Sequence, residues 1–295
     1  MPRKAAIFGS AGQLGCELVR EFGSRGYQVA GPDRGAVDIT DPAQIEASLA
    51  GFAPSVVINA AAYNQVDIAE NEPLAAFQVN ALAVRNLALA CRHLDAKLVH
   101  YSTDYVFDGR AGRPYREEDP THPLGAYAVS KLAGELYARA YLDNALVIRT
   151  SGVFGIAGRY TPRGNFVELM LRLAAENKPI RVVEDHVASP TYAPLLAART
   201  ADLVERGEDG IFHIGGGTPI SWFEYARLIF RLAGLDPEIR ATNEREYRTA
   251  ARRPKYSALS NEKMDALGLP RMPPLEEALR DYLNHRLEVR PPRPA

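Results

Sequence analysis

The sequence predicts an α/β protein with a doubly wound parallel sheet and a smaller C-terminal α/β domain. The segments at 5–8, 56–58 and 146–148 are apolar without polar alternation, as in strands covered by helices on both faces. Segments with helical spacing of apolar residues separate them, for example residues 14–22. A length of 295 residues also leaves room for about two domains. Alternating strands and helices of this kind predict a parallel sheet.

Local sequence signals predict where the individual helices, strands and loops lie. Pro42 directly after Asp41 is typical of a helix start, and Ser221 followed by Glu224 is a capping box. Residues 155–164 are rich in glycine, arginine and proline and predict a mobile loop. The expected strands are 5–8, 27–30, 56–58, 97–102, 146–149, 180–183 and 210–215. The expected helices include 75–94, one that starts near Tyr127, 166–177 and one after Ser221.

We expect two domains from this order of elements. Residues 1–150 should form the first domain, and residues of about 187–214 should return to it. Residues 151–295 should mainly form the second domain, which would bind the substrate in the cleft between the two.

The composition excludes several classes of protein. Thirty-five basic residues against 36 acidic residues give a net charge of -1, so no basic excess favours a nucleic-acid partner. No apolar segment approaches the roughly 20 residues that span a bilayer, so we expect no membrane association. Two cysteines among 295 residues exclude a disulfide framework, which makes the cytoplasm the expected compartment.

A glycine-rich loop follows the first strand. Gly9, Gly12 and Gly15 form a GxxGxxG motif between a strand and a helix, where the backbone can approach a pyrophosphate at a helix N-terminus. This context predicts a Rossmann domain that binds NADPH or NADH. The whole loop, which is the expected pyrophosphate site, comprises Gly9, Ser10, Ala11, Gly12, Gln13, Leu14 and Gly15.

Two charged residues follow the second strand. Asp33 lies about 20 residues after the glycines, where a carboxylate can bind the adenosine ribose. Arg34 could instead neutralise a 2′-phosphate. The pair therefore does not decide between NADH and NADPH.

Tyr127 and Lys131 are four residues apart and lie on one face of the predicted helix. A neighbouring ammonium favours the phenolate and lowers the pKa of a tyrosine toward the working range of an acid-base catalyst. Ser102 and Thr103 end the fourth strand at the same edge of the sheet. A hydroxyl at this position can donate to a substrate carbonyl whose oxygen gains charge during hydride transfer.

These motifs together resemble the extended short-chain dehydrogenase/reductase family. The segments that carry the resemblance are 9–15, 59–63, Asn80, 101–107 and Tyr127 with Lys131. Within the family, the chain is similar to the dTDP-4-dehydrorhamnose reductases through nearly its whole length, including 149–151, 164–167, 189–192 and 253–259. The run Ser-Thr-Asp-Tyr-Val-Phe at 102–107 is the most specific of these motifs.

The resemblance implies an NAD(P)H-dependent oxidoreductase that reduces the C4 ketone of dTDP-4-dehydro-6-deoxy-L-mannose to dTDP-L-rhamnose, or a closely related nucleotide sugar. Tyr127 would donate the proton, Lys131 would tune Tyr127 and hold the nicotinamide ribose, and Thr103 would polarise the ketone. It places further cofactor contacts at Asp38, Ile39, Ala61, Ala62, Tyr63, Asn64, Asn80 and Tyr101. It places substrate contacts at Thr103, Asp104, Tyr105, Gly152, Asn165 and Arg253.

Two departures from the family pattern concern the substrate. The family often has a tryptophan after Arg149-Thr150-Ser151, where this chain has Gly152, and residues 153–163 form a longer segment than usual. Both lie where the hexose and nucleotide should bind, so the exact nucleotide sugar stays open. Arg252 or Arg253 could bind the pyrophosphate of the substrate.

Two alternatives remain open. A nucleotide-sugar 4-epimerase that retains NAD uses the same tyrosine and lysine. A non-catalytic NADP-binding regulatory subunit, like the β subunit of methionine adenosyltransferase, shares the fold and the glycine loop.

No metal site is expected. Glu184, Asp185 and His186 form the only cluster that suggests one, and contiguous residues at a strand end cannot all point inward. The resemblance further implies a homodimer, although no long exposed apolar stripe is visible in the sequence.

Overall fold

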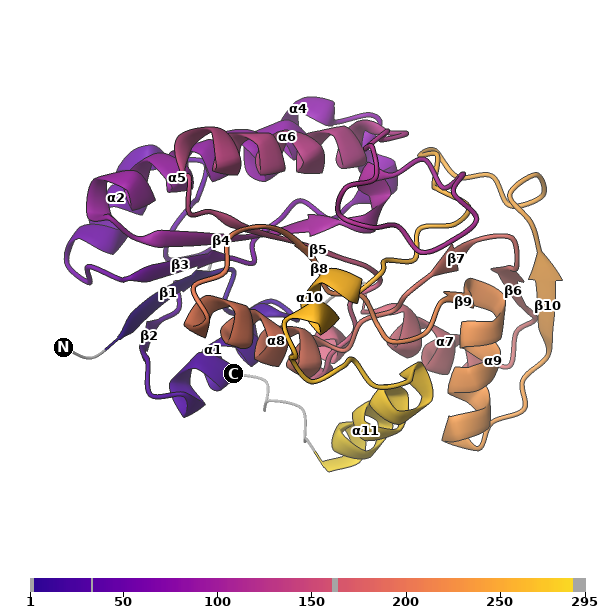
Figure 1. Ribbon diagram of the computed structural model, residues 1–295. Helices are drawn as coiled ribbons and strands as arrows, with labels where there is room; N and C mark the ends of the chain where they lie inside the picture. The colour runs from indigo at the N-terminus through magenta and orange to yellow at the C-terminus, as the bar shows by residue number, and fades with distance from the viewer. Residues whose placement is uncertain (1–2, 33, 161–163, 289–295) are drawn as a thin grey trace.

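The computed structural model describes residues 3–32, 34–160 and 164–288 (Figure 1). Six strands form one parallel sheet in the order β2-β1-β3-β4-β5-β8. The chain moves outward from β1 to β2 and then crosses back to β3, which creates the switch point typical of doubly wound sheets. The strands are β1 (Lys4–Phe8), β2 (Gln28–Ala30), β3 (Val56–Asn59), β4 (Lys97–Thr103), β5 (Leu146–Thr150) and β8 (Gly210–His213).

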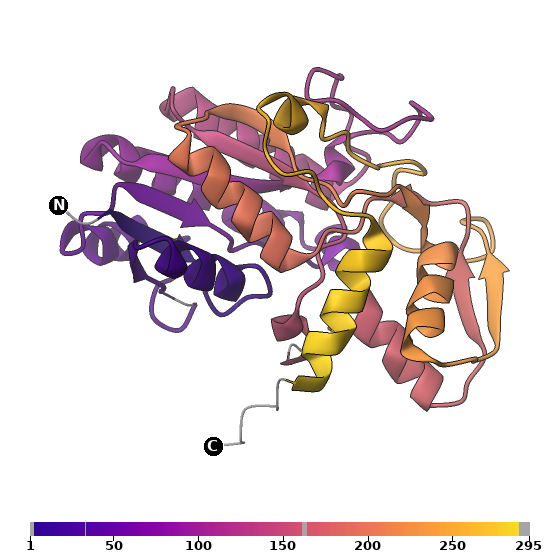
Figure 2. The same cartoon turned by 60° about the horizontal axis from the view of Figure 1, so that its bottom comes forward.

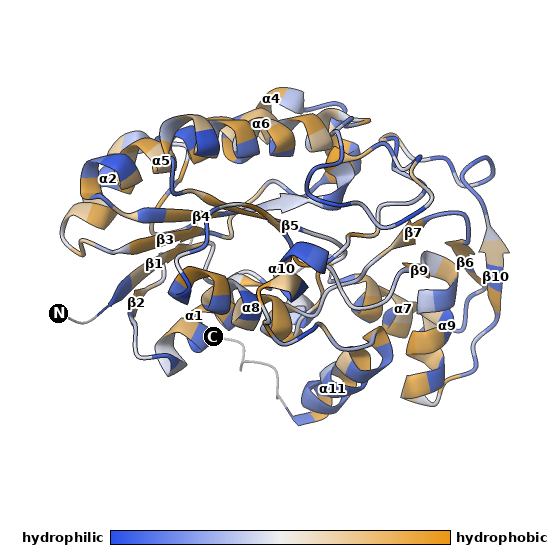
Figure 3. Ribbon diagram, in the orientation of Figure 1, coloured by the Kyte–Doolittle hydropathy of each residue, from blue (hydrophilic) through white to orange (hydrophobic). Residues whose placement is uncertain are grey.

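Helices cover both faces of this sheet, as Figures 1 and 2 show. One face carries α2 (Pro42–Ala50), α5 (Ala83–Leu94) and α6 (Ala126–Tyr141), and the other carries α1 (Gly15–Ser24) and α8 (Ala193–Glu205). The strands are among the most hydrophobic elements in Figure 3, because helices exclude water from both of their faces. The predicted doubly wound parallel sheet is therefore confirmed.

The expected helix at 75–94 consists of three consecutive helical pieces. These are α4 (Pro73–Phe77), the π-helical turn η1 (Gln78–Leu82) and α5. Together they form a 22-residue helix that is long and apolar enough to span a membrane, contrary to our expectation. Half of its most apolar 18-residue stretch is buried, and Val84, Leu87 and Cys91 pack in the core beneath it. Its apolar composition is therefore explained by packing against the sheet.

The C-terminal part of the chain has its own apolar core. Phe154, Tyr225 and Tyr282 belong to this core, which is separate from the two clusters that flank the large sheet. It is built from α7 (Phe166–Ala175), α9 (Trp222–Ala233), α11 (Leu275–Glu288) and the parallel pair β6 (Ile180–Val183) and β10 (Ile239–Thr242). The antiparallel pair β7 (Val187–Ala188) and β9 (Ile220–Ser221) lies beside them (Figure 1). Where one domain ends and the next begins stays a prediction.

The remaining elements are short. They are α3 (Val66–Ala69), η2 (Asp104–Val106), η3 (Ile156–Tyr160) and α10 (Glu262–Ala266). The predicted capping box is present, since the backbone N–H of Glu224 donates to Ser221 Oγ at 3.2 Å. Within the segment expected to be a mobile loop, η3 forms a helical turn, and residues 161–163 lie outside the described residues.

Candidate active site

A cavity of about 590 Å³ opens at the carboxyl ends of β1, β3, β4 and β5. This is the edge at which open parallel sheets bind ligands. Predicted site residues that line it are Gly12, Gln13, Leu14, Ala62, Asn64, Tyr101, Thr103, Asp104, Tyr127, Lys131, Gly152 and Asn165. Ser102, which ends β4 together with Thr103, also lines it. Further lining residues, to which we assigned no role in binding, are Ala60, Thr150, Val153, Gly158 and Gly164.

The glycine loop is shaped by two close approaches of backbone. Gly9 has a φ of +78°, and a Cβ there would lie 2.7 Å from the backbone nitrogen of Ala61. A Cβ on Gly15 would lie 2.0 Å from the carbonyl oxygen of Gly9. These glycines therefore bring the start of α1 against the ends of β1 and β3. Gly12 lies between them and faces the cavity, which leaves room for a pyrophosphate at the helix N-terminus.

Among the described residues, those predicted for the adenosine end do not line the cavity. Asp38 is exposed and accepts hydrogen bonds from the backbone N–H and the hydroxyl of Thr40, at 2.9 and 2.8 Å, which hold the pKa of its carboxyl below the usual value. Ile39 is buried in the core under α2. Arg34 is exposed, and Asp33 lies outside the described residues. Their roles toward a cofactor stay predictions.

Asn80 acts on the loop after β3 without lining the cavity. Its side-chain oxygen accepts from the backbone N–H of Tyr63 at 2.8 Å, and its amide nitrogen donates to the carbonyl of Tyr63 at 3.0 Å. The same nitrogen donates to Ser130 on α6 at 3.0 Å. Asn80 is fully buried in the π-helical turn, a feature that often occurs at functional sites. It thereby holds the loop that carries Ala62 and Asn64.

Three side chains meet at the end of β4. The Thr103 side chain hydrogen-bonds Tyr127, and the Tyr105 ring contacts the Tyr127 ring edge to face at 6.2 Å between centroids. Lys131 is buried, and its Nζ donates to the carbonyl oxygen of Tyr101 at 2.5 Å. The four-residue spacing on α6 thus brings Tyr127 and Lys131 to the same wall as Thr103.

Burial governs the ionisation of this group. Burial raises the pKa of Tyr127 well above its usual value, contrary to the lowering that we expected from Lys131, and the hydrogen bond with Thr103 only partly opposes the shift. The phenol therefore carries its proton at neutral pH in the free enzyme. Burial lowers the pKa of Lys131 to about 8, while the carboxylate of Glu135 raises it. A cationic Lys131 near neutral pH can still stabilise a phenolate that forms when Tyr127 loses its proton.

Asp104 is a buried carboxyl with three hydroxyl neighbours. It accepts from Ser257 Oγ at 2.5 Å, Ser151 Oγ at 2.8 Å and Thr103 Oγ1 at 3.2 Å. Burial raises its pKa to about 6, and these hydrogen bonds oppose the shift. Ser257 lies 153 positions away in the sequence, so only the fold brings this group together.

A buried ion pair joins α6 and β5, beside the predicted catalytic residues. Arg149 of β5 donates to both carboxylate oxygens of Glu135 on α6, at 2.9 and 2.7 Å, and both side chains are at most 3% exposed. Ser102 of β4 donates to the same carboxylate at 2.5 Å. Glu135 is four residues after Lys131 and on the same face of α6, and this spacing is the signal that could have identified it.

Gly152 has a structural reason to be glycine. Its φ is +49°, and a Cβ there would lie 3.3 Å from Pro190 Cα and 3.4 Å from the indole ring of Trp222. The ring of Trp222, the only tryptophan in the sequence, therefore packs beside the position where the related reductases often carry one.

Arg253 is paired with protein groups. Its guanidinium donates to both carboxylate oxygens of Asp67, at 3.1 and 2.7 Å, and hydrogen-bonds Tyr105. These contacts place it beside Tyr105, although neither residue lines the cavity. Arg252 is exposed, and a role of either arginine toward a pyrophosphate stays a prediction.

The acidic cluster near β6 differs from our expectation. Ligand atoms of Asp185, His186 and Glu244 lie within 4.8 Å of one another, so two contiguous side chains do converge and a residue from another segment joins them. Glu184 is not part of this group. The ammonium of Lys255 lies 3.4 Å from Asp185 and 3.6 Å from Glu244, so the cluster already contains a cation of the protein.

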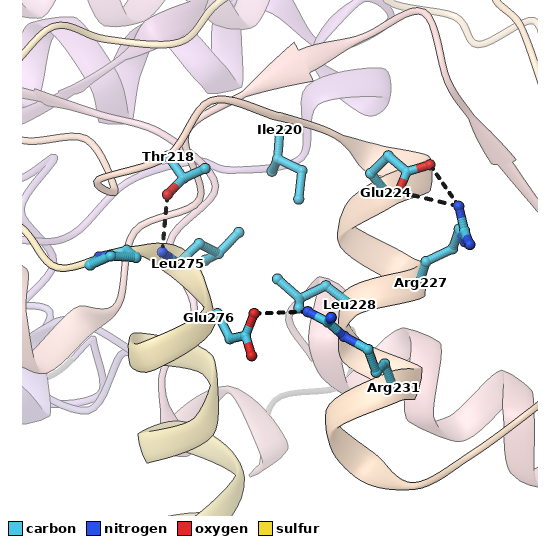
Figure 4. A pocket seen from close by; sticks show the side chains of 9 residues that line it. Thr218, Ile220, Glu224, Arg227, Leu228, Arg231, Leu275 and Glu276 are labelled. Carbon is cyan, nitrogen blue, oxygen red and sulfur yellow. Dashed lines mark hydrogen bonds and ion pairs between the residues drawn. The ribbon is translucent and has the colours of Figure 1, made fainter.

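A second cavity, of about 480 Å³, lies between α9 and α11 (Figure 4). Its charged side chains pair with each other, since Arg227 contacts Glu224 at 3.2 Å and Arg231 contacts Glu276 at 2.8 Å. It contains none of the predicted site residues.

Comparison with known proteins agrees with this geometry. The model of the RmlD substrate binding domain family matches residues 3–288. The spore coat polysaccharide biosynthesis protein SpsK of Bacillus subtilis is 37% identical over 284 residues, which cover 96% of this chain and 98% of that protein. The dTDP-4-dehydrorhamnose reductase of Streptomyces griseus is 39% identical over 270 residues, with coverage of 89% and 87%.

Solved structures show the same fold. The dTDP-4-dehydrorhamnose reductase of Bacillus anthracis, in complex with NADP, superposes with a TM-score of 0.91 at 34% identity over 97% of this chain and 100% of that one. With its parallel sheet, its cavity and its matched length, this chain belongs to the RmlD family, which includes the dTDP-4-dehydrorhamnose reductases.

Proposed function

We propose that the protein reduces the C4 ketone of dTDP-4-dehydro-6-deoxy-L-mannose to dTDP-L-rhamnose, with NADPH or NADH as the reductant. The observation that carries this proposal is the placement of Tyr127, Lys131 and Thr103 in one cavity with the glycine loop. Membership of the RmlD family and 39% identity to a dTDP-4-dehydrorhamnose reductase support the choice of substrate.

The residues present fit a nicotinamide cofactor. Gly12, Gln13 and Leu14 face the cavity at the N-terminus of α1, where backbone N–H groups can bind a pyrophosphate. Tyr101, Tyr127 and Lys131 line the same cavity beyond them. A bound NADPH or NADH supplies the hydride that is added to the ketone carbon.

Tyr127, Thr103 and Lys131 supply the rest of the reaction. As the ketone oxygen gains negative charge, the Tyr127 hydroxyl donates its proton to it, and the Thr103 hydroxyl stabilises the developing charge. The raised pKa of Tyr127 keeps the proton in place until that charge develops. The ammonium of Lys131 then stabilises the phenolate that Tyr127 leaves behind.

The test is the consumption of NADPH or NADH, each supplied separately, with freshly generated dTDP-4-dehydro-6-deoxy-L-mannose. We expect the wild type to oxidise the cofactor and Tyr127→Phe to lose at least about 100-fold in kcat. The phenylalanine keeps the ring and removes only the hydroxyl, so cofactor binding measured by calorimetry should be retained.

Other outcomes would contradict the proposal in distinct ways. Turnover by Tyr127→Phe at the wild-type rate would remove Tyr127 as the proton donor. Cofactor binding without oxidation would favour the binding-subunit alternative. Interconversion of a nucleotide sugar and its C4 epimer with no net oxidation of the cofactor would favour the epimerase.

The proposed enzyme works in the cytoplasm on a small-molecule nucleotide sugar, without nucleic acid or a membrane. We also propose a homodimer. Four exposed apolar side chains on the elements α4, η1 and α6, which contact one another, support it: Leu74, Leu82, Val129 and Leu136. Sedimentation velocity should report twice the 32.3 kDa mass of one chain.

A further inference from the structure

The side chain of Gln13 points away from its own loop and binds the opposite wall of the cavity. Its amide nitrogen donates to the carbonyl oxygen of Val153 at 2.7 Å. Its amide oxygen accepts from the backbone N–H of Gly155 at 3.1 Å and from the side-chain amide of Asn165 at 2.8 Å. Both lone pairs of that oxygen are thus used by residues about 140 to 150 positions away in the sequence.

The opposite wall of the cavity packs tightly against the side-chain amide of Gln13. A Cβ on Gly158 would lie 2.2 Å from the amide oxygen of Gln13 and 2.6 Å from the amide nitrogen of Asn165, so a larger residue there would displace these two amides. Asn165 also accepts from the backbone N–H of Glu168 at 3.0 Å as the N-cap of α7, and donates to the carbonyl of Gly155 at 3.1 Å. Gln13 therefore contacts both the start of α7 and the chain that precedes it.

This inference rests on the proposed function, in which one wall of the cavity binds the cofactor and the opposite wall binds the sugar nucleotide. Gly12, Gln13 and Leu14 face the cofactor side of the cavity. Gly152, Gly158 and Asn165 line the side at which a sugar nucleotide would bind. The backbone of Gln13 lies at the expected pyrophosphate site, while its side chain holds the other wall.

We propose that Gln13 is a positioning residue through which a cofactor bound to the glycine loop orders the substrate wall at residues 152–158 and 165–169. A cofactor that fixes the backbone of Gln13 also fixes its amide, and with it Val153, Gly155 and Asn165. By linkage, the cofactor then increases the affinity for the sugar nucleotide, and the nucleotide increases the affinity for the cofactor by the same factor.

The test is hydrogen exchange of the full-length protein with and without saturating NADP⁺. In the wild type, NADP⁺ should slow exchange in residues 9–15 and, by about fivefold or more, in residues 152–158 and 165–169. In Gln13→Ala, residues 9–15 should still be protected at saturation, while protection of the substrate wall is lost.

Two further variants distinguish loss of the coupling through Gln13 from general destabilisation of the fold. Asn165→Ser keeps an N-cap hydroxyl for α7 but removes the amide that donates to Gln13. It should therefore lose the protection of residues 165–169, whereas Gln13 still binds Val153 and Gly155 directly and should keep protection of residues 152–158. Asn144→Ala is the matched control, because Asn144 is exposed and precedes β5, at the amino ends of the strands, whereas the cavity lies at their carboxyl ends. It should behave like the wild type.

The experiment distinguishes failure of the coupling through Gln13 from failure of the proposed function. Protection of residues 9–15 in the wild type without protection of 152–158 would refute the coupling alone, as would equal protection of 152–158 in Gln13→Ala. If NADP⁺ protects neither region of the wild type, both the coupling and the cofactor assignment are wrong. A second readout is the affinity for dTDP, which NADP⁺ should raise about fivefold or more in the wild type and not in Gln13→Ala.

Discussion

Gly152 is confined by its backbone and by its neighbours. A positive φ is costly for residues with a side chain, and the nearest atoms to a Cβ here belong to Pro190 and Trp222. The contact with Pro190 involves backbone, which cannot rotate away as a flexible side chain would. The position therefore favours glycine irrespective of the substrate.

We expect Gly152→Ala to lower the free energy of unfolding by about 1–3 kcal/mol, because it adds strain at a positive φ. Urea unfolding measures this change. Gly51→Ala is the matched control, since Gly51 has a φ of -75° and nothing lies within 4 Å of its Cβ position. That control should be neutral or slightly stabilising, and equal effects of the two variants would refute strain at Gly152.

Asp104 links protonation to stability. Burial raises its pKa from 3.8 to about 6, so the folded protein holds this proton at a higher pH than the unfolded chain does. The stabilising contribution of this group is therefore fully present below about pH 4. It is lost as the pH rises through 6.

We expect the free energy of unfolding of the wild type, relative to that of Asp104→Asn, to fall by about 2–3 kcal/mol between pH 4 and pH 7. Urea unfolding of both proteins across this range measures the difference, in which groups common to both cancel. Asp143→Asn, at an exposed position, should show no comparable trend. A constant difference between the wild type and Asp104→Asn would contradict the raised pKa.

At the scale of elements, one ion pair and one hydrogen bond join α6, β5 and β4. Glu135 on α6 binds Arg149 on β5 and Ser102 on β4, which directly precedes Thr103. Because both charged groups are buried, the loss of one partner leaves the other charge without compensation. The helix that carries Tyr127 and Lys131 is thereby held against the strand that carries Thr103.

We expect Arg149→Met to lower the free energy of unfolding by about 3–5 kcal/mol. Adding Glu135→Gln should recover part of this loss, because the buried carboxylate is then removed as well. Denaturant unfolding of the two single variants and the double variant measures the coupling, and strict additivity would show that the charges do not interact. Arg227→Met, which breaks an exposed pair with Glu224, should cost no more than about 1 kcal/mol.

At the scale of the whole molecule, the cavity lies where the large sheet meets the C-terminal core. The glycine loop belongs to the N-terminal sheet, and Asn165 begins the helix α7 that packs in the third apolar core. A ligand in this cavity contacts both parts of the folded chain. The unfolded chain has no such site, so binding should stabilise the folded state.

We expect NADPH or NADH at 100 times its dissociation constant to raise the free energy of unfolding by about 2.7 kcal/mol. Thermal or urea unfolding measures this shift, and the cofactor with the higher affinity should give the larger shift at equal concentration. Tyr127→Phe should keep most of it, because the phenol is needed for proton transfer. The absence of any shift with either cofactor would contradict the cofactor site.

Local patterns in the sequence were sufficient for much of the fold and part of the site. The four-residue spacing of Tyr127 and Lys131 is a property of one helix, and the glycine loop is a property of one turn. The parallel sheet was likewise predicted from a local pattern, the alternation of apolar strands with helices. Local periodicity and sterics act over a few residues and are therefore readable without the fold.

By itself, then, the sequence determined the doubly wound sheet, the glycine loop and the helix that carries Tyr127 and Lys131 on one face, whereas the tertiary structure alone decided which distant residues support them. Ser257 beside Asp104, Asn165 beside Gln13 and Glu244 beside Asp185 come from segments far apart in the chain. Such contacts depend on how whole elements pack, and no local periodicity encodes that packing. The roles of Asp104 and Gln13 proposed here therefore follow from long-range packing.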